Sequence, residues 1–388
     1  MNTGVAAQTE VIERAVLRRS GDRGVHSFAL SRAGCDEYFV TAPMIGGECP
    51  RTLFERTAGA LHDCGAAIVS MEIAGVPHGP GLVREVFGPV AWPVTWIDRR
   101  PATTMGGVRV WAVAGPSPTP IHRGETIVAA RFEGPWAVYC RVGGLIPEDT
   151  DTAPANQATS VLNAMAAALR GAGMDFSDVV RTWFFNRDIT AWYDAFNRAR
   201  NLFFEAHGMS PCHIPASTGV GGGVGRGVGG AALTAGLLAV RPSDARVQIE
   251  AVDSPMQCSA TNYGSAFSRA IAATFPDHGR LLVSGTASIA PRGQTEHAGD
   301  VAAQTDRTID VVGALLASRE MSWDDVTDGI AYVKRADDVA AVAERFARKR
   351  IEGLPIMFVH ADICRDDLLF ELEVNAISVR NDSARGPG

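Results

Sequence analysis

Hydrophobic residues recur every three or four positions in two stretches of the chain that lie 147 residues apart, as Gln157 and Gln304 do. The first stretch carries Leu162, Met165, Ala166 and Leu169, and the second carries Ile309, Val312, Gly313 and Leu316. This spacing places the apolar side chains on one face of a helix. Each predicted helix is followed, without a gap in the alignment, by the related segments 174–179 and 321–326. The chain therefore contains an internal repeat.

The residues after each repeated segment change from a helical to an extended pattern. Residues 180–185 and 329–333 are rich in β-branched and aromatic side chains and predict strands. A second helix is predicted over 190–207 and over 338–352, because Gly208 and Gly353 stop the helical pattern and a proline follows soon after. Each copy thus predicts a strand between two helices.

Further apolar segments complete the two copies. Residues 136–144 and 280–285 predict a strand before the first helix, and residues 368–377 predict a final strand. The order is β-α-β-α-β, in a first unit over 126–245 and a second over 246–380. A helix over 51–62 and a strand over 66–73 indicate that 26–125 is a degenerate third copy, which would make the chain a pseudo-trimer. Residues 1–25 and 381–388 are expected to be flexible tails.

Composition narrows the class of protein. The 388 residues are 46% hydrophobic and 20% charged, as in an ordinary globular protein, and the net charge of −7 disfavours a nucleic-acid partner. No apolar run is long enough for a membrane span, and residues 1–23 lack the apolar core of a secretory signal. The seven cysteines are scattered without a CxxC pair. We therefore expect a cytoplasmic protein with free thiols and without a metal site.

The glycine-rich segment 219–230 invites comparison with loops that bind phosphate. It lacks the GK[ST] ending of such loops and runs directly into an apolar stretch. A flexible connection or a loop that lines a pocket is the better interpretation.

Seven segments of the chain resemble the chorismatases, bacterial enzymes of the YjgF/Rid-like fold, which is also called chorismate-mutase-like. The resemblance implies an α/β (α+β) fold of tandem units and covers about two thirds of the chain. The matching segments are RTWFFNRDIT (181–190), YDAFNRAR (193–200), IPASTGVGG (214–222), NYG with FSRA (262–270), LLVSGTASI (281–289), YVKR (332–335) and HADICRDDLLFELE (360–373).

Two acidic residues alternate on the last predicted strand. Glu371 and Glu373 project from one face, and burial there would raise the pKa of a carboxyl toward neutrality, where it can donate and accept protons. A structural ion pair explains the same pattern equally well. The resemblance distinguishes the two acids, since Glu371 matches the catalytic glutamate of chorismatases and Glu373 the supporting one.

Chorismate is a dianion, and arginine is the side chain best suited to bind carboxylates. Tyr193 and Arg200 lie seven residues apart on one predicted helix and match the substrate-binding tyrosine and arginine of the family. Arg269 matches a second arginine, and Tyr263 is the candidate for a second tyrosine. Taken alone, each of these side chains would more often be solvated.

Four further residues are candidates for the pocket. Lys334 and Arg335 end a predicted strand, where Rid-like proteins place ligand contacts, although solvated cations are the more common case at strand ends. Gly285 and Cys364 resemble the branch of the family that forms 3-hydroxybenzoate, whereas the hydrolytic branch tends to carry alanines there. Cys364 has no evident catalytic partner, so we expect it to shape the pocket.

The resemblance implies conversion of chorismate to 3-hydroxybenzoate and pyruvate, with Glu371 as general acid and base and without a cofactor. One alternative is hydrolysis to 3,4-dihydroxycyclohexa-1,5-dienoate and pyruvate. Another is a Rid-type imine deaminase, disfavoured because Ser217 and Met357 stand where that class carries an arginine. A third is a non-enzymatic metabolite-binding protein. Because the repeats can form subunit-like contacts within one chain, we expect a monomer or weak oligomer.

Overall fold

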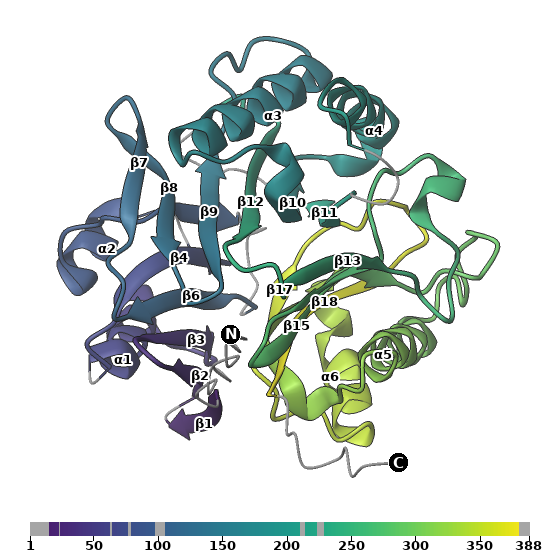
Figure 1. Cartoon of the computed structure of the whole chain (residues 1–388). Helices are drawn as coiled ribbons and strands as arrows, with labels where there is room; N and C mark the ends of the chain where they lie inside the picture. The colour runs from purple at the N-terminus through teal and green to yellow at the C-terminus, as the bar shows by residue number, and fades with distance from the viewer. Residues whose placement is uncertain are drawn as a thin grey trace, which may run out of the picture.

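The computed structural model describes residues 15–22, 24–62, 64–76, 79–97, 105–209, 214–222 and 229–379, without the side chain of Tyr263. Within these ranges the chain forms three units, and each unit contains one six-stranded sheet. The units lie side by side around a common centre, with their helices on the outside (Figure 1). The predicted pseudo-trimer with an N-terminal copy is confirmed.

The three units have the same order of elements. The first contains β1 (Val16–Asp22), β2 (Val25–Arg32), β3 (Cys35–Pro43), α1 (Pro50–His62), β4 (Ala67–Ala74), α2 (Pro80–Phe87), β5 (Val94–Ile97) and β6 (Gly107–Ala114). The second contains β7 (Thr119–Arg123), β8 (Thr126–Glu133), β9 (Ala137–Leu145), α3 (Pro154–Gly171), β10 (Val179–Asn186), α4 (Ile189–Ala206), β11 (Ala216–Gly221) and β12 (Leu233–Pro242). The third contains β13 (Gln248–Val252), β14 (Ala270–Thr274), β15 (His278–Ala287), α5 (Val301–Ala317), β16 (Val326–Val333), α6 (Val339–Arg348), β17 (Ile356–His360) and β18 (Phe370–Val379).

Strand order is also identical in the three sheets. It runs β1-β2-β3-β6-β4-β5, then β7-β8-β9-β12-β10-β11, then β13-β14-β15-β18-β16-β17. The predicted β-α-β-α-β order is present in each unit, and three further strands extend it. Two of them form a hairpin at the start of the unit, and one parallel strand follows the second helix.

The N-terminal boundary differs from the predicted one. Residues 1–14 of the predicted tail lie outside the described residues, and so does the C-terminal segment 381–388. Residues 16–22, however, form β1, which pairs antiparallel with β2. Most of β1 is exposed, so it lacks the alternation of apolar and polar residues by which a half-buried strand is recognised. Its polarity made it resemble a tail.

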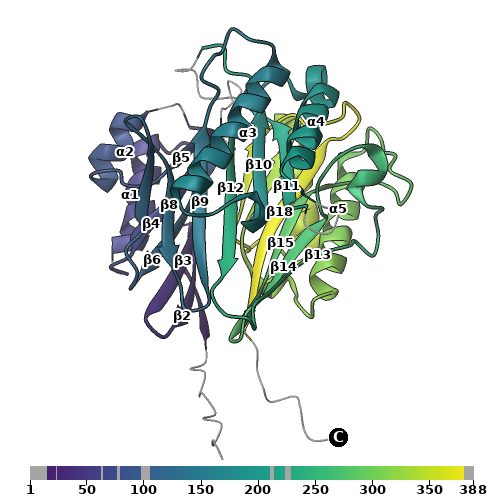
Figure 2. The same cartoon turned by 45° about the horizontal axis from the view of Figure 1, so that its top comes forward.

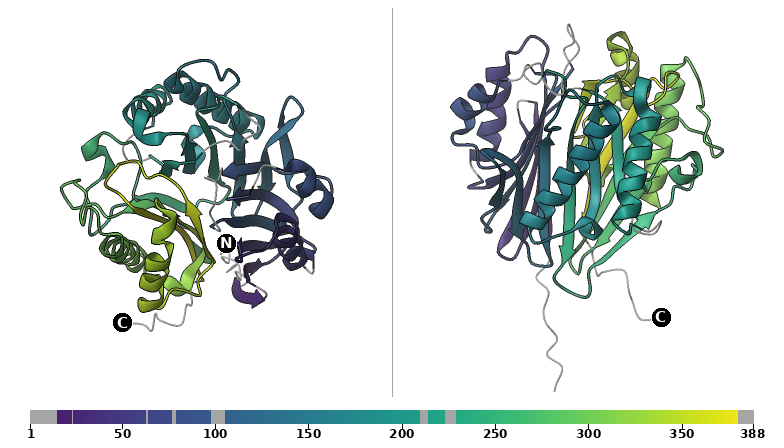
Figure 3. Two further views of the ribbon diagram at one scale, coloured as in Figure 1. Left: turned by 180° about the vertical axis from the view of Figure 1, so that it is seen from behind. Right: turned by 90° about the horizontal axis from the view of Figure 1, so that it is seen from above.

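Each sheet is buried on both faces, with helices on one side and the other two sheets on the other (Figures 2 and 3). Three apolar clusters lie between a sheet and its own helices, and a larger cluster joins residues of all three units at the centre. Accordingly, every residue of β10 and β16 is buried. Within the part of the chain that the structure describes, no helix is long and apolar enough to cross a membrane.

The repeated sequence segments form the same local structure in units two and three. Asp175 and Ser322 each begin a short 3-10 turn, and their side chains accept from the backbone two residues on. Asp178 and Asp325 complete reciprocal capping boxes at the ends of these turns. The equal spacing of the two repeated segments is therefore explained by a capped turn that leads into β10 in unit two and β16 in unit three.

The two glutamines that open the repeats also have equivalent roles. The Gln157 amide donates to the carbonyls of Thr150 and Thr152 and accepts from the Ala232 N–H. Gln304 donates to the carbonyls of His297 and Asp367 and accepts from Leu369. Each buried side chain thus fixes a loop to the start of the last strand of its unit, β12 or β18.

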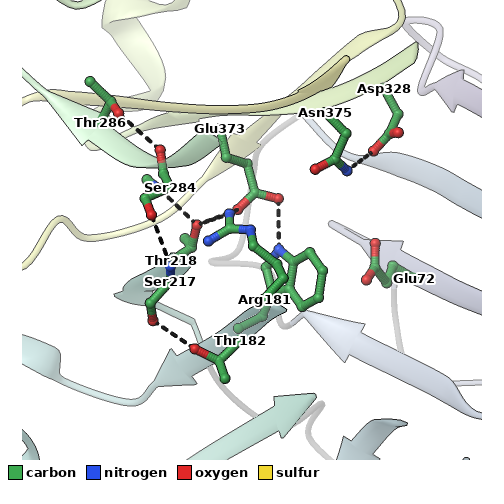
Figure 4. Close-up of polar contacts among 12 residues, drawn as sticks. Glu72, Arg181, Thr182, Ser217, Thr218, Ser284, Thr286, Asp328, Glu373 and Asn375 are labelled. Atoms are coloured by element: carbon green, nitrogen blue, oxygen red, sulfur yellow. Dashed lines mark hydrogen bonds and ion pairs between the residues drawn. The ribbon is translucent and has the colours of Figure 1, made fainter. Parts of the chain in front are cut away.

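Charged side chains from the three units meet at the centre of the molecule (Figure 4). The shared topology relates their positions. Arg181 and Asp328 are each the first paired residue beyond the register shift between the fourth and sixth strands of their unit. Arg109 and Glu373 occupy equivalent positions on the sixth strands of units one and three. The cluster is buried and contains three arginines and three acids, namely Arg109, Arg141, Arg181, Glu72, Asp328 and Glu373. Paired charges of this kind offset the cost of removing each from water.

Candidate active site

A cavity lies at the boundary between units two and three. The edge strand β11 of unit two approaches β15 of unit three there, and the Ser217 N–H donates to Ser284 Oγ at 2.9 Å. The cavity is lined by Tyr193, Arg200, Ser217, Gly219, Phe267, Arg269, Gly285, Ala287, Ile289, Cys364, Arg365, Leu368 and Glu371. Six residues predicted from the sequence are therefore brought together from α4, β15, β18 and two loops.

Glu371 is the acid of this cavity. It lies on β18 between Ala287 on β15 and Tyr332 on β16 and is only 5% exposed. Burial raises the pKa of Glu371 to about 8, and the charge of Glu373 contributes in the same direction. Arg181 and Arg269 act against this shift. At neutral pH the carboxyl therefore holds a proton that it can donate.

Glu373 has a different environment, although it is two residues away on the same strand. Its Oε1 accepts from Arg109 at 3.3 Å and from the Trp183 indole at 3.0 Å. Its Oε2 accepts from Arg181 at 2.9 Å and from the Thr218 hydroxyl at 2.5 Å. Glu373 is not among the residues that line the cavity, and it belongs instead to the central charge cluster (Figure 4).

Two buried arginines face the cavity. Arg200 on α4 donates to the side-chain oxygen of Asn197 at 2.8 Å, and Arg269 donates twice to the carbonyl of Cys258, at 2.9 and 2.8 Å. Both guanidinium groups lie over the ring of Phe267, at 5.9 and 5.5 Å from its centre. These contacts fix the two cations at one end of the cavity, where they can bind carboxylate groups.

Tyr193 and Cys364 form another part of the wall. Tyr193 stacks on Phe196 of the same helix, with ring centres 6.3 Å apart. Burial, together with the charge of Glu371, raises the pKa of the Cys364 thiol to about 12, so the thiol is protonated and uncharged at neutral pH. The side chain therefore adds an uncharged thiol to the cavity wall.

Gly285 lies directly against the catalytic candidate. A methyl group added at this position would overlap Glu371 Oε1 and would come within 3.0 Å of its Cδ. The absence of a side chain is therefore what allows the Glu371 carboxyl to occupy its place. Gly285 also donates its N–H to the Thr218 hydroxyl at 3.0 Å.

The remaining sequence candidates lie elsewhere. Lys334 Nζ donates to the carbonyls of Arg365 and Asp366, at 3.2 and 2.9 Å, and so supports the loop beside the cavity without lining it. Arg335 precedes the turn Ala336–Asp338 and does not line the cavity either. The side chain of Tyr263 lies outside the described residues, although its backbone ends the turn Ala260–Tyr263.

The sequence did not identify several residues of the site. Arg365 lines the cavity and donates to the Gly293 carbonyl at 2.7 Å. Phe267 and Ser217 also line the cavity, and only their presence in segments similar to chorismatases marked them.

The glycine-rich segment has a part in the site. Gly219 lines the cavity. Gly221 packs against the backbone of Asp362, to whose carbonyl its N–H donates at 2.6 Å, and a side chain there would overlap that residue. Residues 223–228 lie outside the described residues.

Comparison with known proteins confirms the resemblance to chorismatases. A chorismatase of Streptomyces rapamycinicus is 29% identical over 225 residues, which are 52% of this chain and 64% of that protein. A 3-hydroxybenzoate synthase of Streptomyces hygroscopicus is 31% identical over 225 residues, 51% of this chain and 63% of that protein. The matches thus span less than two thirds of the length of these relatives. No family model matches the chain.

A solved structure supports the fold. The crystal structure of a chorismatase superposes with a TM-score of 0.61 over 87% of this chain and 98% of that chain, at 21% sequence identity. Together with the three equivalent sheets, this superposition confirms the predicted fold class.

Proposed function

We propose that the chain is a chorismatase that converts chorismate to 3-hydroxybenzoate and pyruvate. The observation that carries the proposal is Glu371, a buried carboxyl with a pKa raised to about 8, in one cavity with two buried arginines. An acid protonated at neutral pH and cations placed for carboxylates are the two features that cleavage of a dianionic enol ether requires. Similarity to a chorismatase and to a 3-hydroxybenzoate synthase supports the proposed substrate and product.

The proposed reaction uses Glu371 twice. The C4 hydroxyl oxygen attacks C3 of the ring, the C3–O bond to enolpyruvate breaks, and Glu371 gives its proton to the leaving enolpyruvate, which becomes pyruvate. The resulting arene-oxide-like intermediate keeps the hydroxyl hydrogen on its oxygen. Its C4–O bond then breaks, and the ring proton at C3 passes to the Glu371 carboxylate, which restores the acid and yields 3-hydroxybenzoate. The sum of the two products equals chorismate, so no water is consumed.

The cavity wall favours this route over hydrolysis. Gly285 leaves the Glu371 carboxyl against the main chain, and Cys364 adds an uncharged thiol to the wall. Close packing around the acid limits the access of water to the intermediate. Arg200 and Arg269 would bind the substrate carboxylates, and Tyr193 would contact the substrate from α4.

Incubation of the purified protein with chorismate, followed by identification of the products, tests the proposal. Equimolar 3-hydroxybenzoate and pyruvate are expected. Release of 3,4-dihydroxycyclohexa-1,5-dienoate would identify the hydrolytic alternative. Unchanged chorismate would favour a metabolite-binding protein, and release of ammonia from an amino-acid-derived imine would indicate an imine deaminase.

A further inference from the structure

The hydroxyl of Thr218 is shared by three groups at the boundary between units two and three. It donates to Glu373 Oε2 at 2.5 Å, and it accepts from Arg181 Nη2 at 2.6 Å and from the Gly285 N–H at 3.0 Å. A hydroxyl has one donor hydrogen and two acceptor lone pairs, so all its hydrogen-bonding capacity is used. Thr218 is fully buried and belongs to unit two, whereas Glu373 belongs to unit three (Figure 4). Gly285 also belongs to unit three, on β15.

The place of Gly285 in the sheet explains why its N–H needs this acceptor. The pairing of β15 with β18 shifts between Val283 and Thr286, which pair with Val374 and Leu372. Ser284 and Gly285 therefore form a bulge opposite Glu373, and neither has a register partner on β18. Thr218 connects the two sides of the bulge, since it bonds both to Gly285 within it and to the residue opposite it.

An equivalent contact between a threonine hydroxyl and a glycine N–H occurs at the boundary between units one and two. The Thr95 hydroxyl accepts from the Gly144 N–H at 2.9 Å. Thr95 pairs with Glu72 as Thr218 pairs with Trp183, and both partners occupy the same position in their units. Thr95 is therefore the equivalent of Thr218 in the preceding unit.

The residues facing the two threonines differ. Glu371 and Glu373 pair with Tyr332 and Ile330 of their central strand. In unit two the equivalent pairs are Thr234 with Phe185 and Gly236 with Trp183. Thr95 thus accepts from a backbone N–H of the next unit, whereas Thr218 accepts from the equivalent N–H and also donates to the carboxylate two residues from Glu371.

We propose that Thr218 is a positioning residue for the reaction, which holds the Gly285 bulge and Glu373 in the arrangement that places the Glu371 carboxyl for proton transfer. The proposal rests on the function proposed above. The Gly285 backbone limits where the Glu371 carboxyl can lie, because even a methyl group would overlap it there. A shift of this backbone therefore moves the proton donor relative to the substrate.

Steady-state kinetics with chorismate test the role. Thr218→Val keeps the shape of the side chain but removes the hydroxyl, and we expect kcat to fall about 10- to 100-fold, as for a misplaced catalytic group. KM should change less than about threefold, because the proposed substrate-binding residues Arg200 and Arg269 are unchanged. Thr218→Ser should restore most of kcat. Thr95→Val, the matched control, should keep wild-type kcat. Should Thr218→Val fail to fold, Thr218→Ala replaces it.

A second measurement does not depend on the substrate. Hydrogen exchange of the 281–287 segment should be faster in Thr218→Val than in the wild type and in Thr218→Ser. Unchanged exchange, or a Thr218→Val enzyme with wild-type kcat, would overturn the positioning role. An equal loss of kcat in Thr95→Val would overturn it as well, because it would show that weakening either contact between units lowers kcat. A wild type that turns over no chorismate would refute the proposed function. Hydrogen exchange would then still show whether the Thr218 hydroxyl holds the Gly285 bulge in place.

Discussion

Glu371 and Glu373 have opposite surroundings although they are neighbours on one face of β18. Four donors surround Glu373, which is therefore an acceptor at both oxygens. Glu371 lies in the cavity, where burial keeps it protonated and the charge of Glu373 adds to this effect. Two acids in different environments take different roles. The donors around Glu373 suit the supporting role that we propose for it, and the raised pKa of Glu371 suits a proton donor.

The pH dependence of the reaction follows from this assignment. Because the pKa of Glu371 is raised to about 8, the free enzyme holds the proton below that pH and loses it above. We expect kcat/KM for chorismate to be flat near neutrality and to fall about tenfold per pH unit above about pH 8. Initial rates across this range, with far-UV circular dichroism to check folding at each pH, measure it. A rate that rises through pH 8 would contradict the role of Glu371 as the first proton donor.

Glu371→Gln should abolish turnover and also remove a dependence of stability on pH. The carboxyl ionises near its usual pKa in the unfolded chain and only near 8 in the folded protein, so unfolding releases a proton in between and stability falls as pH rises. The wild type should lose about 3 kcal/mol of unfolding free energy between about pH 5 and about pH 7 that the variant keeps. Denaturant unfolding at both pH values measures the difference. Retained turnover in the variant would refute the catalytic role.

Gly285→Ala tests the geometry around the acid. The added methyl group overlaps the Glu371 carboxyl, so either this side chain or the β15 bulge must move. We expect kcat to fall at least about tenfold and the share of 3-hydroxybenzoate among the products to decrease, since a displaced acid leaves room for water. Product analysis by chromatography measures both. An enzyme with unchanged rate and products would show that the close contact has no role.

At the level of elements, the sequence predicted the helices and strands whose apolar residues recur with a clear period. The helices of units two and three and their central strands were recognisable from apolar periodicity, and the repeated segments gave the capped turns. The hairpin strands β7 and β13 were missed because they are short and partly exposed, so few apolar positions mark them. β1 was mistaken for a tail for the same reason.

Contacts between distant segments could not be predicted in this way. Thr218 and Glu373 lie 155 positions apart in the sequence. No local spacing indicates that they share a hydrogen bond, and the same holds for Arg109, which reaches Glu373 from unit one. The resemblance to a family placed Glu371, Arg200 and Arg269 in one site, but it gave no reason for the different environments of the two acids.

The buried glutamines allow a matched test of how an element positions the acid. Gln304 fixes the entry of β18, which carries Glu371, whereas Gln157 fixes the entry of β12, which carries no acid of the site. Gln304→Leu and Gln157→Leu should each destabilise the fold by about 1 to 3 kcal/mol, because each leaves one buried backbone N–H, of Leu369 or Ala232, without its partner. Only Gln304→Leu should also lower kcat, by about tenfold. Equal kcat in both variants would show that β18 needs no such support.

On the scale of the whole molecule, three equivalent boundaries have diverged. The position of Glu371 in unit three corresponds to Gly107 in unit one and Thr234 in unit two, as their pairing with Ala74, Phe185 and Tyr332 shows. Neither glycine nor threonine has a side chain that ionises near neutral pH. Of these three equivalent positions only the one in unit three holds an acid, so the repeat provides the scaffold and one boundary provides the chemistry.

The same arrangement predicts the oligomeric state. The apolar cluster at the centre contains residues of all three units, and the central ion pairs join them as well. Each unit thus finds both its neighbours within the chain, so no second copy is needed to bury the inner faces of the sheets. We expect a monomer, or at most a weak oligomer, whose mass by native mass spectrometry is near 41.1 kDa at micromolar concentration. Activity per chain should then be independent of protein concentration. A stable trimer of the chain would contradict the inference that the three units replace three subunits.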